Sequence, residues 1–85
     1  MTHALKLRKC YCDPVYQGRK SFEVRYNDRN FQVGDYVKFR PVDDNGNDIR
    51  HPVEDAFYVI TYVLSDPDYN KEHYCVFSIR QIGIA

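Results

Sequence analysis

The sequence predicts a mainly β (α+β) domain in which five or six antiparallel strands curl into a small barrel, with one short helix near the N-terminus. Apolar and polar residues alternate along several segments, as in strands with one buried face. Aromatic residues are frequent, with eight Tyr and five Phe in 85 residues. Turn-forming residues separate the segments, and strands in so short a chain hide their edges by closing the sheet.

The first third of the chain contains two predicted strands. Residues 3–8 alternate apolar Leu with basic side chains, which is the period of a half-buried strand. Residues 20–26 form the second strand, in which Phe22 and Val24 point one way and Glu23 and Arg25 the other.

A short helix over residues 10–17 is predicted between these two strands. Asp13 is a suitable cap, Pro14 fits the first helical position, and Gly18 can end the helix in a left-handed turn.

The remaining strands are separated by recognisable turns. Residues 36–42 form the third strand, and Asn45-Gly46 is the strongest hairpin signal in the chain. We expect the partner strand to begin near Ile49 or Val53, with His51-Pro52 making a bend or an edge.

Two further strands complete the expected sheet. Residues 57–64 are apolar at nearly every position, which favours a strand covered on both faces or wrapped inside a small barrel. Residues 65–70 form a loop, and residues 74–82 form the last strand, in which Cys75, Phe77 and Ile79 share one face. We expect one domain over residues 1–85.

Charge is unevenly distributed in a chain of zero net charge. Residues 1–29 carry seven basic and three acidic side chains, and residues 30–85 carry five basic and nine acidic ones. A basic first third can present an anion-binding face without making the whole protein basic. The alternative is a solvated surface with charges on both sides.

The three cysteines indicate neither a disulfide framework nor a metal centre. An odd count without a signal peptide favours reduced thiols and a cytoplasmic location. Cys10 and Cys12 lack the spacing of a zinc site, and Cys75 lies in an apolar run. The longest apolar run, from Ala56 to Leu64, is too short to cross a membrane. We expect no metal, no cofactor and no membrane association.

One motif carries a family resemblance. Residues 18–25, Gly-Arg-Lys-Ser-Phe-Glu-Val-Arg, resemble the Gly-x-Lys-[Ser/Thr]-x-Glu-x-Arg signature of ASCH-type domains. Residues 26–35 continue as Tyr-Asn-Asp-Arg-Asn-Phe-Gln-Val-Gly-Asp, which resembles the DUF3850 branch. The ends of the chain fit that branch too. The resemblance implies a PUA-like barrel. The PUA-like superfamily is associated with RNA and often with modified nucleosides, and one small bacterial relative hydrolyses an acetylated cytidine.

The motif residues also have chemistry of their own. Glu23 and Arg25 project from the same strand face, and Lys20 lies at the strand entrance. Such a group can bind a phosphate or a base edge, with Arg as a planar fork, or it can perform acid–base chemistry with Lys20 as the base. The structural alternative is that Glu23 and Arg25 pair with Asp28, Arg29 or Asp35 to hold the loop.

Other residues near the motif complete the candidate site. Arg29 adds a second guanidinium, Asn27 is also a good turn former, and His3 could join from the first strand. Tyr26, Phe31 and Tyr36 could stack a base. The predicted ligand- and nucleic-acid-binding set is Lys20, Ser21, Glu23, Arg25, Asn27, Arg29 and His3.

Three functions remain open at this point. The leading hypothesis is a module that binds RNA or a nucleotide-like ligand at a cleft formed by Lys20, Glu23, Arg25 and Arg29. The second is a small hydrolase acting on a modified nucleoside, with Lys20 as base and Glu23 or Glu72 as its partner. The third is a protein-interaction domain.

The hydrolase hypothesis meets two departures from the relative's pattern. That relative has a helical stretch with a catalytic carboxylate before its last strand, whereas residues 64–74 form a short loop here. It also has Thr at the position of Glu23.

Overall fold

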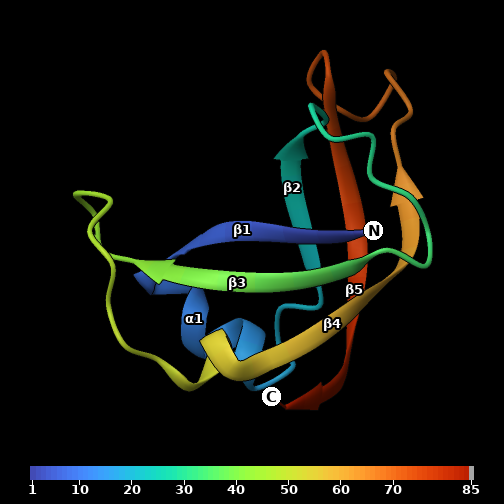
Figure 1. Cartoon of the computed structure of the whole chain (residues 1–85). Coiled ribbons are helices and arrows are strands. Elements are labelled where there is room, and N and C mark those ends of the chain that lie inside the picture. Colours follow the sequence, from blue (N-terminus) through green and yellow to red (C-terminus); the bar gives the residue numbers. More distant parts are fainter. Residues whose placement is uncertain (85) are drawn as a thin grey trace.

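The computed structural model describes residues 1–84, and these form a mixed sheet that curls into a half-barrel (Figure 1). The strand order is β1-β3-β4-β5-β2. The elements are β1 Thr2–Arg8, α1 Lys9–Tyr16, β2 Phe22–Tyr26, β3 Tyr36–Val42, a 3-10 helix Pro52–Asp55, β4 Ala56–Leu64 and β5 Tyr74–Ile84. The prediction of a mainly β fold with a short helix near the N-terminus is confirmed.

One strand pairing differs from the predicted antiparallel arrangement. β1 runs parallel to β3, in register from Thr2↔Tyr36 to Arg8↔Val42, while the other pairs are antiparallel. Parallel neighbours need a long crossover between them. The chain supplies it, because α1 and β2 both lie between β1 and β3 in sequence.

The core fills the concave side of the sheet. The predicted inward faces of β1 and β5 are both buried: Leu5 and Leu7 on β1, and Cys75, Phe77 and Ile79 on β5. The alternation in the sequence therefore identified these faces correctly. α1 and the 3-10 helix lie side by side below β3 in Figure 1. Their buried members close the core at that end.

The helix begins earlier than predicted. α1 starts at Lys9 directly after β1, so Asp13 and Pro14 lie inside it rather than at its start. Burial of Cys12 and Val15, three residues apart, anchors the helix to the core, and this packing outweighs the backbone hydrogen bond that Pro14 cannot make. Gly18 ends the helical segment with φ +78°, as predicted. No helix among residues 1–84 is long and apolar enough to cross a membrane.

The Asn45-Gly46 turn forms, but the strand expected after it does not. Gly46 has φ +81° and its amide donates to the Asp43 carbonyl at 3.0 Å. A single bridge, Val42↔Asp48, follows, and among the described residues no strand begins near Ile49 or Val53. The next strand is β4, Ala56–Leu64, which confirms the strand predicted over residues 57–64. Pro52 offers no amide for a ladder.

β4 is covered on one face, not on both. Ala56, Tyr58 and Ile60 are buried, whereas the alternate residues Phe57 and Val59 are only partly buried. A register shift between Ile60 and Tyr62 reverses the alternation, and Tyr62 beyond it is 64% exposed. The uncovered side continues across β5 to β2, where Phe22, Val24 and Tyr26 are exposed. We call this convex side of β4, β5 and β2 the outer face.

Candidate functional site

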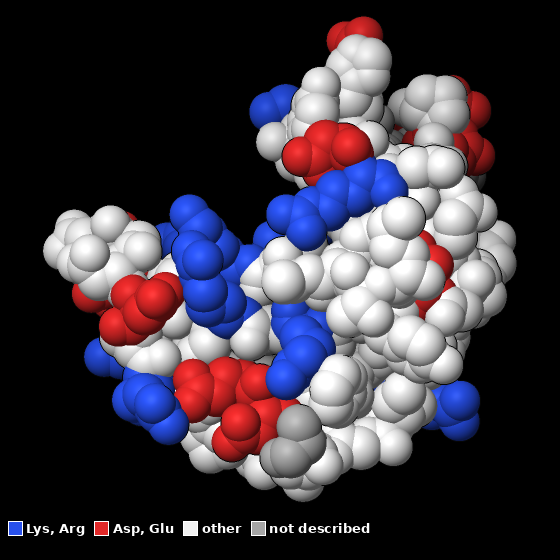
Figure 2. All heavy atoms as spheres, in the orientation of Figure 1, with Lys and Arg blue, Asp and Glu red and all other residues white. Residues whose placement is uncertain are grey.

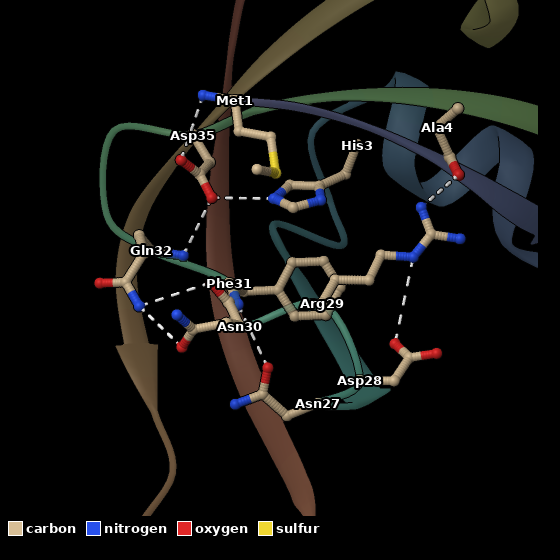
Figure 3. A network of polar contacts seen from close by, with 10 residues as sticks. All are labelled: Met1, His3, Ala4, Asn27, Asp28, Arg29, Asn30, Phe31, Gln32 and Asp35. Atoms are coloured by element: carbon tan, nitrogen blue, oxygen red, sulfur yellow. Dashed lines mark hydrogen bonds and ion pairs between the residues drawn. The ribbon is translucent and has the colours of Figure 1, made fainter.

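Two arginines connect the edge strands of the sheet. β1 and β2 occupy opposite ends of the strand order, and no ladder joins them among the described residues. Arg25 Nη2 donates to the Lys6 carbonyl at 2.6 Å. Arg29 Nη1 donates to the Ala4 carbonyl at 3.0 Å, and this second contact is drawn in Figure 3. We call this junction between β1 and β2 the seam.

Glu23 lies inside the half-barrel, at the centre of a charge triad. Its side chain is only 3% exposed. Oε1 accepts hydrogen bonds from Arg25 Nη2 at 2.7 Å and Nε at 3.0 Å, and Oε2 accepts one from Lys20 Nζ at 2.5 Å. A buried carboxylate without partners costs several kcal/mol. Glu23 therefore pairs with Arg25 and with Lys20, and the predicted alternative pairing of Glu23 or Arg25 with Asp28, Arg29 or Asp35 is not seen among residues 1–84.

A pocket of about 740 Å³ opens at the seam, between β1, α1 and β2. We call it the seam pocket. Lys20 Nζ lies 5.0 Å from the centroids of both the Tyr11 and the Phe22 ring, and both rings are partly exposed. The lining comprises Lys6, Leu7, Arg8, Cys10, Tyr11, Pro14, Arg19, Lys20, Phe22, Glu23, Val24 and Arg25.

A second, smaller hollow of about 270 Å³ adjoins the seam pocket and is lined by basic side chains. We call it the basic hollow, and its lining is Ala4, Leu5, Lys6, Arg25, Arg29 and Arg40. No acidic residue lines it, and it shares Lys6 and Arg25 with the seam pocket. Figure 2 shows basic side chains on both sides of a depression between the arm at residues 43–48 and the upper ends of β2 and β5.

Two cations of the basic hollow are direct neighbours in the sheet. Lys6 of β1 and Arg40 of β3 are register partners, and like charges opposite each other destabilise a sheet. Arg40 Nε lies 3.2 Å from Asp48, which is mostly exposed. An anion bound between Lys6 and Arg40 would relieve their repulsion.

Backbone acceptors at the seam are already occupied. Besides the two carbonyls of β1 bound by arginines, the Phe22 carbonyl accepts a hydrogen bond from Lys20 Nζ at 2.8 Å. Cations thus cover the carbonyl groups that would repel an anion. The seam is suited to a ligand rich in hydrogen-bond acceptors.

His3 points away from the seam pocket into the core. Its Nε2 lies 2.8 Å from Asp35 Oδ2, and its ring meets Phe31 edge-on at 4.8 Å (Figure 3). The His3 hydrogen bond is the main cause that lowers the pKa of Asp35, and the Gln32 amide and the N-terminal ammonium act in the same direction. The arrangement ties the start of β1 to the loop before β3.

The other predicted residues are dispersed. The Ser21 carbonyl accepts the Ile79 amide at 2.9 Å, and Ser21 lines a separate cavity of about 60 Å³. Asn27 and Glu72 line a pocket of about 500 Å³ at the far end of β2, which we call the distal pocket. Thus Lys20, Glu23 and Arg25 come together with Arg29 beside them, whereas Glu72 does not meet Lys20.

Sequence reasoning missed Lys6, Tyr11 and Arg40 as site residues. The alternation along β1 indicated that Lys6 points away from the core, and Tyr11 lies within the predicted helix. Neither pattern indicated a binding role. The closeness of Arg40 to Lys6 depends on the parallel register, for which the sequence contains no local signal.

Within residues 1–84, no three His, Cys, Asp or Glu side chains converge to hold a metal ion. Cys10 is exposed and Cys12 is buried, and burial raises the pKa of the Cys12 thiol.

Comparison with protein families gives a match over most of the chain. A family model described as "Domain of unknown function (DUF3850)" matches residues 2–79. The matched range contains every residue that lines the seam pocket and the basic hollow. No curated protein matches the chain.

Proposed function

The chain belongs to the DUF3850 family, a family without an assigned function, and we propose that it is a module that binds single-stranded RNA or a nucleotide-like ligand at the seam. The observation that carries the proposal is the basic hollow, in which Lys6, Arg25, Arg29 and Arg40 line one space without an acidic residue. The ASCH-type signature in residues 18–25 supports the same class of ligand.

The basic hollow is the phosphate site. Guanidinium groups bind phosphate through paired N–H donors, and lysine adds a compact positive charge. Arg40 and Lys6 are the best candidates for direct contact, because both side chains are exposed on neighbouring strands.

The seam pocket holds the base. Tyr11 and Phe22 expose ring surface on either side of the Lys20 ammonium, and stacking on an aromatic ring contributes about 1–3 kcal/mol per base in single-strand binding. A base can reach the rings only when it is unpaired. Because the two cavities share Lys6 and Arg25, one nucleotide can place its base in the pocket and its phosphate in the hollow.

Glu23 positions the cations of the site. It lines the seam pocket, but both of its oxygens already accept hydrogen bonds from Lys20 and Arg25, and these bonds fix the two cations at the pocket wall. Variants that test binding must therefore leave Glu23 and its partners intact.

Salt-dependent binding tests the proposal directly. We expect the affinity for a short single-stranded RNA to fall steeply between about 50 and 200 mM salt, because phosphate contacts release counterions. The double variant Lys6→Gln/Arg40→Gln should bind weakly, with a smaller salt slope and a melting temperature close to that of the parent. Fluorescence anisotropy and thermal unfolding measure these quantities.

Arg50→Gln is the matched control. Arg50 is highly exposed, pairs with Glu54 at 3.2 Å and, within residues 1–84, is not among the residues that line the cavities described above, so this variant should bind like the parent. If the affinity for RNA stays constant across the salt range, or if the double variant and the control lose equal affinity, the basic hollow does not bind phosphate.

A further inference from the structure

The distal pocket is lined by aromatic rings at the opposite end of β2 from the seam pocket. Tyr26, at the end of β2, meets Tyr74 edge-on at 5.6 Å, and the His73 ring lies 6.0 Å from Tyr26. All three line a space of about 500 Å³. Tyr26 is 52% exposed, so its ring offers surface to a stacking partner.

Two asparagines give the distal pocket unused hydrogen-bonding groups. Asn27 Oδ1 accepts the Phe31 amide at 3.2 Å, and Asn70 Nδ2 donates to the Leu64 carbonyl at 2.9 Å. Among residues 1–84, neither the side-chain nitrogen Nδ2 of Asn27 nor Asn70 Oδ1 has a hydrogen-bond partner within the protein. The lining thus combines a donor with an acceptor, which is the polarity of a nucleobase edge.

The distal pocket suits a base better than a phosphate. Its charged lining residues are one Lys and one Glu, Lys71 and Glu72, besides His73. Glu72 lies 3.3 Å from His73, and the Lys71 ammonium lies 5.3 Å from the Tyr74 ring. The distal pocket thus lacks the excess of positive charge that lines the basic hollow.

The backbone at His73 is strained. Its φ is +65°, a left-handed conformation that is costly for a residue other than Gly. The His73 carbonyl also accepts a hydrogen bond from the backbone N–H of Asn27 at 2.8 Å, which holds the strained residue against the end of β2. Strain of this kind tends to occur at ligand sites.

An uncharged strip of the outer face connects the two pockets. Phe22 and Val24 line the seam pocket and Tyr26 lines the distal pocket, and all three are exposed on the same side of β2. Phe22 and Tyr26 are about 13 Å apart along the strand, which is several times the spacing of about 3.4 Å between stacked nucleotides. A ligand in both pockets must be an oligonucleotide.

We propose that the distal pocket binds a second, unpaired base of the same RNA strand, stacked on Tyr26. The inference rests on the proposed function and makes it more specific, because the ligand becomes a single strand of several nucleotides that runs along β2. Tyr26 supplies the ring, and Asn27 and Asn70 supply hydrogen bonds to the base edge.

Binding of single-stranded RNAs of increasing length tests this inference. We expect affinity to rise from a nucleoside monophosphate through short oligonucleotides until both pockets are filled. Tyr26→Ala should weaken binding of the longer RNAs by about tenfold and leave the monophosphate unaffected. Tyr26→Phe, which keeps the ring, should bind like the parent. Tyr62→Ala is the control, because Tyr62 is exposed on the outer face but lines neither pocket.

The results separate this inference from the proposed function. Equal affinity for all lengths, or no selective effect of Tyr26→Ala on long RNAs, overturns the distal base site. The proposed function then still stands if the monophosphate depends on Lys6 and Arg40. Absence of binding at every length overturns both. A change in sedimentation mass without a change in affinity would identify the surface around Tyr26 as a self-association surface and would also overturn the inference.

Discussion

Glu23 is a carboxylate on the inward face of β2, and a buried carboxylate is tolerated only when it is paired. On β2 the apolar residues Phe22 and Val24 face outward, and Glu23 faces the interior. The burial is tolerated because Lys20 and Arg25 both bind the carboxylate. Arg25, which the sequence indicated as a ligand-binding residue, thus has a structural task as well.

Removal of Arg25 should therefore destabilise the fold. Arg25→Ala leaves Glu23 with Lys20 alone and leaves the Lys6 carbonyl without its donor. We expect the free energy of unfolding to fall by about 3 kcal/mol, as for other broken buried ion pairs, and urea denaturation measures it. Glu23→Gln/Arg25→Gln, which removes both charges, should recover part of the loss. Parent-like stability of Arg25→Ala would show that the triad is not needed for folding.

Asp35 makes the stability of the domain sensitive to acid. Its pKa is lowered below the ordinary value of 3.8, first by the His3 hydrogen bond. The folded state therefore favours the ionised Asp35 carboxylate, which adds to the free energy of unfolding. This contribution is fully present above pH 3.8 and is lost as the pH falls through the lower, native-state pKa of Asp35.

Replacement of Asp35 should reduce this sensitivity. Asp35→Asn is expected to be less stable than the parent at neutral pH, and the difference should shrink as the pH falls below the ordinary pKa of Asp. Urea titrations at several acidic pH values measure it, with the exposed Asp44→Asn as control. A difference that stays constant with pH would exclude the linkage.

Strands were easier to predict than their connections. The alternation along β1 and β5 identified the buried Leu5, Leu7 and Phe77 correctly, because the period of a strand is recorded locally. The start of α1 was placed wrongly, since tertiary packing of Cys12 and Val15 outweighs the capping preference of Asp13. The strand expected after Gly46 does not form, and Pro52, which has no N–H to donate to a ladder, begins a 3-10 helix instead.

The turn at Gly46 offers a test of the one connection that was predicted well. Gly46 adopts φ +81° with open space around its α-carbon, so Gly46→Ala should cost about 1 kcal/mol through backbone strain alone. Gly46→Asn should cost less, because Asn accepts the left-handed conformation more readily. Thermal unfolding of both variants gives the comparison, and equal effects would mean that the backbone conformation does not determine the cost.

At the scale of the whole molecule, the candidate site is only partly visible in the sequence. Lys20, Glu23 and Arg25 are neighbours along the chain, and their convergence follows from strand geometry. Lys6 and Arg40 meet only because a parallel crossover brings their strands together. Arg40 belongs to residues 30–85, which carry more acidic than basic side chains. The basic first third of the chain therefore did not indicate Arg40 as part of the site.

The seam has a mechanical consequence. A backbone ladder holds two strands at one spacing of about 4.8 Å, but Arg25 and Arg29 reach β1 through long side chains with several rotatable bonds. The distance between β1 and β2 can therefore change without the loss of any backbone hydrogen bond in the rest of the sheet. We therefore expect the spacing between β1 and β2 to vary more than the spacing between strands that share a ladder, while every ladder of the sheet stays intact.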